Sequence, residues 1–169
     1  PRDFVPALGM FTPVAVDMGF NYSGAARIAR MEEYFNTEAE LLANDDEAMN
    51  IDIVGFSRGA AQAREFANRI AARTTPDGWY QYTVPGQNGA PSVTRCQKVN
   101  FRFLGLWDTV LSTNRGPSYN LGIPEQFAHV AHAVALNEFR GQTGRWVSGS
   151  YLGAFPLESI KGGRTPEGK

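Results

Sequence analysis

Cysteine and histidine are scarce in this sequence, and it has neither a long apolar run nor an excess of one charge. A single cysteine, Cys96, among 169 residues excludes an intrachain disulfide and gives no information about the redox compartment. We expect its side chain to be a small, partly buried apolar group. No apolar run approaches the roughly 20 residues of a transmembrane helix, and no signal peptide opens the sequence. The net charge of −1 gives no basic surface for nucleic acid.

The length and composition are those of one globular domain, residues 1–169. With 43% hydrophobic and 20% charged residues, the chain can bury a substantial core. The sequence opens at Pro1 without an initiator methionine and ends in a polar, glycine-containing stretch, residues 162–169. These ends predict a piece of a longer polypeptide.

Residues 50–64 have the organisation of a nucleophile elbow. They read N-I-D-I-V-G-F-S-R-G-A-A-Q-A-R, which predicts an apolar strand over 51–56, a sharp turn and an alanine-rich helix. The turn holds the G-x-S-x-G pattern centred on Ser57. A serine hydroxyl is a weak nucleophile unless it stands exposed beside a base, and such a turn exposes it. We expect Gly55 and Gly59 there because a side chain at either position would collide with the neighbouring strand or helix.

The start of the following helix predicts an oxyanion site. Backbone N–H groups at a helix N-terminus point toward a bound anion, so the N–H of Arg58 is the first candidate donor. The alternative is a tight strand–helix turn in which Ser57 only caps the helix. The pattern by itself is weak in a chain with 18 glycines, and its position between a strand and a helix is what favours the nucleophile.

Helical spacing also predicts how the helix after the elbow is oriented. Small apolar residues share the face that would lie on a sheet, namely Ala60, Ala63, Ala67, Ile70 and Ala71. Glu65 and Arg69 form an i,i+4 pair on the opposite, solvated face. Arg64 flanks the alanine stripe, either as a boundary arginine or as an ion-paired structural residue near the sheet.

Two further segments surround the elbow. Before it, residues 22–36 have helical spacing, and Asn36-Thr37 is expected to interrupt this helix before another turn over 37–43. After it, residues 74–97 form a long polar stretch rich in turn formers. This stretch is either a lid or a surface excursion with a short hairpin.

An acidic residue follows the next apolar segment. Residues 98–107 become a continuous apolar run, as in a buried parallel strand, and Asp108 comes directly after it. A carboxylate at the carboxyl end of an interior strand lies on the ligand-binding edge of an open α/β sheet, where Ser57 would also lie. The order Ser then Asp matches α/β-hydrolases, in which the acid orients a histidine. The alternative for Asp108 is a capping role.

The last part of the chain holds both histidines. A helix is predicted over 125–140 and a strand over 145–157. His129 and His132 would lie on that helix among apolar residues, as core histidines. Glu138 would lie on a buried stripe of the same helix and need a cationic partner, which Arg64 or Arg140 could supply. We expect Glu138 to lie near Arg64.

Three blocks occur in a characteristic order: G-F-S-R-G-A-A-Q-A-R at 55–64, F-L-G-L-W-D-T-V at 103–110 and H-A-V-A-L-N-E-F-R at 132–140. Together they resemble an uncharacterised α/β-hydrolase domain family found in bacterial type VI secretion phospholipase effectors, the first lipase-effector family. The resemblance covers about residues 19–160. It implies a parallel sheet with flanking helices, with Ser57 as the nucleophile and Asp108 as the triad acid.

The resemblance also implies a function. The expected activity is that of a serine lipase or phospholipase that hydrolyses acyl esters of membrane glycerophospholipids without a cofactor or metal. The protein would be made in the bacterial cytoplasm and secreted as an antibacterial effector toxin. It would then act on the phospholipid membrane or in the periplasm of the target cell, with an immunity protein and a secretion-system spike protein as partners.

Two departures from the family pattern bear on the catalytic base. The family's first strand, with its G-T motif near the oxyanion hole, is expected before residue 1, and no H-S-D-x-G-G-like motif follows Arg140. The chain is therefore expected to be the central fragment of the domain, with the catalytic histidine outside it. The alternatives are a triad that uses His129 or His132, and a non-catalytic binding module of the same fold.

Overall fold

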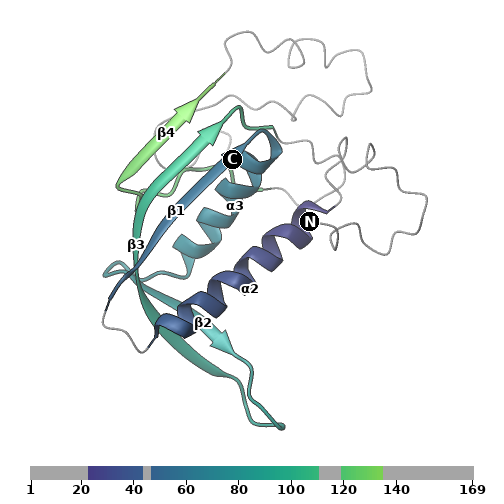
Figure 1. Cartoon of the computed structure of the whole chain (residues 1–169), viewed down its shortest axis with the longest axis vertical. Coiled ribbons are helices and arrows are strands. Elements are labelled where there is room, and N and C mark those ends of the chain that lie inside the picture. The colour runs from purple at the N-terminus through teal and green to yellow at the C-terminus, as the bar shows by residue number, and fades with distance from the viewer. Residues whose placement is uncertain (1–22, 44–46, 111–118, 135–169) are drawn as a thin grey trace, which may run out of the picture.

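The computed structural model describes residues 23–43, 47–110 and 119–134. These residues form a four-stranded sheet and two helices, which confirms the α/β class (Figure 1). The elements, in chain order, are α2 (Gly24–Leu42), β1 (Met49–Phe56), α3 (Arg58–Ala72), β2 (Trp79–Val84), β3 (Val93–Trp107) and β4 (His129–Ala133).

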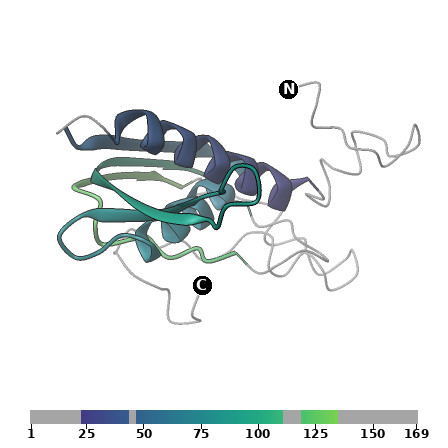
Figure 2. The ribbon, with the colours of Figure 1, turned by 90° about the horizontal axis from the view of Figure 1, so that it is seen from below.

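The long strand β3 organises the sheet because it pairs with the other three strands. Its second half pairs in parallel with β1, up to Phe56 opposite Trp107. The same half pairs in parallel with β4, up to Trp107 opposite Ala133. Its first half pairs antiparallel with β2. The carboxyl ends of β1, β3 and β4 therefore meet at one edge, while the β2–β3 hairpin projects at the other end of the molecule (Figures 1 and 2).

Both helices lie on the same side of the strands (Figure 1). The Phe35 ring of α2 contacts Phe66 of α3 and Tyr80 of β2 edge-to-face, with ring centroids 5.8 and 5.0 Å apart. On β1, Ile51 and Ile53 are buried toward the helices. The other face of the strands carries exposed apolar side chains in the part of the chain that is described: Val54, Phe56 and Trp107.

Crossover handedness explains why the connections share one face. Each strand added after β1 lies further in the same direction across the sheet, in the order β1, β3, β4. Right-handed crossovers in one direction place every connection on the same face. The connection from β3 to β4 follows this rule, because Asn120 and Gly122 within it are hydrogen-bonded to α3.

Most of the predicted elements before residue 110 are confirmed, with two refinements. β1 and α3 lie where the patterns predict them, and the strand predicted over 98–107 is the second part of β3, which already begins at Val93. The polar stretch after α3 contains the β2–β3 hairpin, which agrees with the surface excursion. The predicted interruption at Asn36-Thr37 is wrong: α2 is continuous, because Phe35 and Ala39 on either side of it pack against the core and the Thr37 hydroxyl donates to the Glu33 carbonyl within the helix.

The helix predicted over 125–140 is wrong in its described part. Residues 124–127 form a turn in which the Phe127 ring packs on Phe101, with centroids 5.1 Å apart. Residues 129–133 then form β4. A five-residue segment can adopt either period, and here pairing with β3 decides in favour of the strand. The rest of that helix, including Glu138, and the strand predicted over 145–157 lie outside the described residues.

Candidate active site

Ser57 joins β1 to α3 in a strained backbone conformation. Its φ is 56° and its ψ is −124°, a region that residues with a Cβ rarely adopt. Such conformations persist only where the surroundings impose them, and they cluster at functional sites. Ser57 occupies the N-cap position of α3, but its side chain makes no capping hydrogen bond, which argues against the side-chain cap of the alternative interpretation.

The glycines on either side of the serine have different roles. A Cβ on Gly55 would lie 2.5 Å from the Gly59 carbonyl oxygen and 2.6 Å from Ala60 Cα, so only glycine lets the helix start so close to the strand. This confirms the expectation for Gly55. The same expectation is wrong for Gly59, because a Cβ there would meet no atom within 4 Å.

Asp108 lies beside Ser57 at the carboxyl edge of the sheet. The last paired residues of β1 and β3 are Phe56 and Trp107, so the serine and the aspartate each come one residue after the end of adjacent parallel strands. The Ser57 N–H donates to the Trp107 carbonyl oxygen at 2.8 Å, and the Ser57 carbonyl accepts from the Val110 N–H at 3.1 Å. The turn that carries the acid is thus bonded to the serine on both sides of Asp108.

The acid turn is held on its other side by β4. The Asp108 N–H donates to the Ala133 carbonyl oxygen at 2.9 Å. Asp108 has a φ of 46°, a left-handed conformation that aspartate tolerates better than most residues. Ser57, Arg58 and Asp108 are each half-buried. Arg58 is the first residue of α3, at the helix end that carries the positive pole of the backbone dipoles.

Arg64 of α3 contacts the turn that carries Asp108 from the buried side of that turn. Its side chain is only 1% exposed, and its Nη1 donates to the Thr109 hydroxyl at 3.3 Å. Thr109 follows Asp108 directly and is itself buried. Arg64 is therefore not a boundary arginine. The predicted contact with Glu138 cannot be compared, because Glu138 lies outside the described residues.

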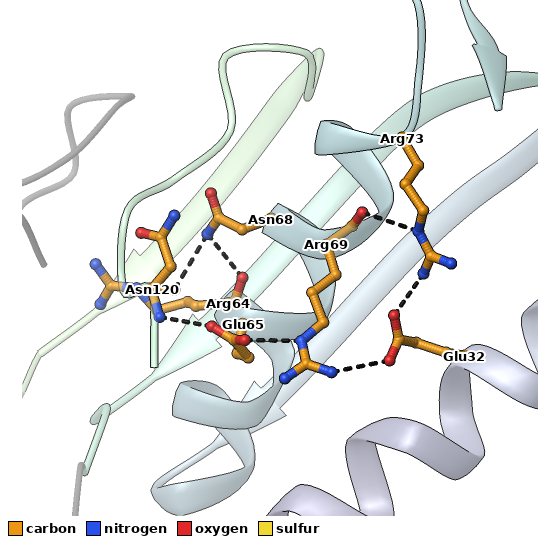
Figure 3. A network of polar contacts seen from close by, with 7 residues as sticks. All are labelled: Glu32, Arg64, Glu65, Asn68, Arg69, Arg73 and Asn120. Atoms are coloured by element: carbon orange, nitrogen blue, oxygen red, sulfur yellow. Dashed lines mark hydrogen bonds and ion pairs between the residues drawn. The ribbon is translucent and has the colours of Figure 1, made fainter. Parts of the chain in front are cut away.

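The next polar side chains of α3 hold the segment that follows the acid loop (Figure 3). Glu65 accepts from the Asn120 backbone N–H at 2.6 Å. Asn68 donates to the carbonyl oxygens of Asn120 and Gly122 at 3.1 and 2.8 Å. Glu65 is thus buried by this segment, and its predicted place on a solvated face is wrong. Sequence periodicity cannot reveal these contacts, because the partners lie more than 50 residues away along the chain.

A second set of ionic contacts joins α3 to α2 (Figure 3). The predicted pair is confirmed: Arg69 Nε lies 2.7 Å from a Glu65 carboxylate oxygen. Arg69 also bonds to Glu32 of α2 at 2.9 Å, and Arg73 bonds to the same carboxylate. Burial acts to lower the pKa of Arg69, but its hydrogen bonds to Glu65 and Glu32 outweigh burial and raise that pKa. The Glu65 carboxylate is therefore held by the Asn120 backbone N–H on one side and by the Arg69 guanidinium on the other.

The two histidines lie on β4 and not on a helix, which corrects their predicted setting. His129 is exposed and lies opposite Phe103, five residues before Asp108 in the neighbouring strand. At about 3.3 Å per residue this is roughly 16 Å from the acid. His132 lies opposite Leu106, on the face toward the helices, and both of its ring nitrogens are shielded from solvent.

Other side chains give little further chemistry. Within the described ranges, no group of three or more histidine, cysteine, aspartate or glutamate side chains could hold a metal ion. No described helix is long and apolar enough to cross a membrane. Cys96 is exposed on the β2–β3 hairpin, so its predicted partial burial is wrong.

In comparisons with known proteins, no family model, no curated protein and no solved structure matches this chain. The roles of Ser57, Asp108 and Arg58 therefore depend on their chemistry and geometry, together with the resemblance of the three sequence blocks.

Proposed function

We propose that this chain carries the nucleophile and the acid of a serine carboxylester hydrolase. The observation that supports this most is the pairing of a strained, half-buried Ser57 with Asp108 at the ends of adjacent parallel strands. A residue that only linked a strand to a helix would have no reason to hold this conformation. Two backbone hydrogen bonds join the Ser57 turn to the Asp108 turn. They fix the distance between the serine and the aspartate, which a shared histidine would bridge.

In the proposed reaction the Ser57 oxygen attacks the ester carbonyl carbon while a histidine accepts its proton. Asp108 orients that histidine and stabilises its charged form. The N–H of Arg58, with one further amide, holds the oxyanion until the alcohol leaves with the proton from the histidine. A water molecule, deprotonated by the same histidine, then attacks the acyl-enzyme. The carboxylic acid product is released and Ser57 recovers its proton. We assign the role of this histidine to neither His129 nor His132, but to a histidine outside the 169 residues of this sequence.

The substrate class follows only from the resemblance. It points to acyl esters of membrane glycerophospholipids, hydrolysed by a type VI secretion effector in the periplasm or membrane of a rival cell. An immunity protein and a secretion-system spike protein are the partners that this proposal includes. The exposed apolar side chains Phe56 and Trp107 beside the edge are compatible with an apolar substrate but do not select one.

A fluorophosphonate probe tests the proposal, because it labels only a serine activated by a base. The complete natural polypeptide should be labelled, Ser57→Ala should not, and Asp108→Asn should react much more slowly. Asp52→Asn is the matched control, since Asp52 is a carboxylate of β1 that is exposed and bonded to Arg102. Absence of labelling in the folded wild-type protein would favour the non-catalytic binding module.

A further inference from the structure

We propose that Arg64 is a positioning residue, which holds the Asp108 turn in register with Ser57 through the hydroxyl of Thr109. This inference rests on the proposed function. Arg64 lies seven residues after Ser57 on the same helix, and Thr109 comes one residue after Asp108. Helix α3 therefore carries the nucleophile at its start and, two turns further on, the arginine that supports the Asp108 turn.

The environment of Arg64 makes this contact specific. A guanidinium that is 1% exposed has lost its water, so its protein hydrogen bonds determine where its partners lie. Thr109 is 4% exposed and its hydroxyl accepts from Nη1 at 3.3 Å. The Thr109 side chain is consequently held against α3, and with it the backbone of the turn that carries Asp108.

The acid turn needs such a support because its backbone is in a costly conformation. Asp108 has positive φ, and so has Ser57 opposite it. Either residue could relax to an ordinary conformation if its neighbours moved. The bond from Val110 to Ser57 and the bond from Arg64 to Thr109 together oppose that movement from two directions. Catalytic groups tolerate displacements of only about 0.5 Å.

Four variants separate positioning from simple stability. Arg64→Met removes the guanidinium but keeps an unbranched stem, and Thr109→Val removes the hydroxyl but keeps the shape. Arg64→Lys and Thr109→Ser are the conservative partners, because each keeps a donor or an acceptor. The control is Arg73→Met, since Arg73 is the C-cap residue of the same helix and is also partly buried. Its side-chain contacts with Glu32, the Arg69 carbonyl oxygen and the Tyr80 ring lie away from the acid turn.

The kinetic measurement is ester hydrolysis by the complete natural polypeptide, with kcat expressed per site titrated by the fluorophosphonate probe. We expect kcat to fall on the order of 10–100-fold in Arg64→Met and Thr109→Val with KM little changed. Thr109→Ser should restore most of the rate, and the double variant should lose little more than either single one. Loss of folded protein alone would lower the number of titrated sites without changing kcat per site.

Amide hydrogen exchange supplies a readout that does not depend on activity. The Val110 N–H, bonded to Ser57, should exchange faster in Arg64→Met relative to the Leu104 N–H within β3, and Arg73→Met should leave this ratio unchanged.

Several results would overturn the proposal. One is a kcat per site within twofold of wild type in both Arg64→Met and Thr109→Val. Another is an equal loss in Arg73→Met. An unlabelled, inactive wild type would refute the proposed function itself, and unchanged Val110 exchange in Arg64→Met would then refute the coupling separately.

Discussion

The backbone N–H of Ser57 donates to the carbonyl oxygen of Trp107 at 2.8 Å, one residue before Asp108. The nucleophile turn and the acid turn are therefore a single hydrogen-bonded unit, and neither can move far without the other. The helix that starts at the serine extends this unit downward, because it also contacts Thr109 and the segment 119–123. The candidate site thus depends on α3 for both of its halves.

Replacing Ser57 should separate activity from stability. Ser57→Ala and Ser57→Gly should both lower hydrolysis by several orders of magnitude, since each removes the nucleophile. Ser57→Gly should also be more stable than Ser57→Ala by about 1 kcal/mol, because glycine accepts the conformation that strains any residue with a Cβ. Urea unfolding and ester hydrolysis measure the two effects. Near-wild-type turnover in either variant would contradict the assignment of the nucleophile.

The two elbow glycines should respond oppositely to the same substitution. Gly55→Ala forces a Cβ into backbone atoms of Gly59 and Ala60, so we expect a loss of about 3 kcal/mol or more and misplacement of the serine. Gly59→Ala meets open space inside a helix and should stabilise the protein by up to about 1 kcal/mol. Thermal unfolding of both variants checks this. Equal destabilisation would mean that the elbow is packed differently.

Local patterns predicted the elbow, its strand and its helix because an apolar run, a glycine turn and an alanine stripe each act within a few residues. They did not predict β4, since residues 129–133 become a strand only by pairing with β3. They left the role of Arg64 open between a boundary and a structural arginine, and they missed the roles of Glu65 and Asn68. In the sequence these polar side chains look like solvated or boundary residues. Their partners, Thr109 and Asn120, lie more than 40 residues later in the chain and bury them only in the folded protein.

Asn68 should prove more important for stability than its polar character suggests. Asn68→Ala leaves the carbonyl oxygens of Asn120 and Gly122 without their donor, at a cost of about 1–3 kcal/mol. Asn68→Asp should cost more, because it places a carboxylate against them. Thr37→Ala is the control: it removes an exposed hydroxyl bond within α2 and should change stability by less than about 0.5 kcal/mol. Urea unfolding of Asn68→Ala that matches wild type would show that α3 does not hold this segment.

Tyr82 should make stability depend on alkaline pH. Burial, followed by the hydrogen bond to Glu40 at 2.9 Å, raises its pKa to about 12. Because the folded pKa lies above the ordinary value near 10, the contribution of the neutral phenol is complete below about pH 10 and is lost as pH rises toward 12. Tyr82→Phe should therefore unfold in urea with a weaker dependence on pH between 9 and 11.5, roughly, than wild type. Tyr34→Phe, which removes an exposed phenol, is the control variant.

The two histidines of β4 should both be dispensable for activating Ser57. His129 lies opposite Phe103, roughly 16 Å along the strand from the acid at about 3.3 Å per residue. His132 lies beside Leu106 on the helix-covered face, with ring nitrogens that solvent does not reach, so a proton taken from the serine would be confined there. His129→Ala should label with the fluorophosphonate probe as wild type does. His132→Ala should lower the unfolding temperature, since it empties a shielded site, yet label normally per folded molecule. Loss of labelling in a folded His132→Ala protein, with His129→Ala unaffected, would instead place the base within this chain and promote the triad of Ser57, Asp108 and His132.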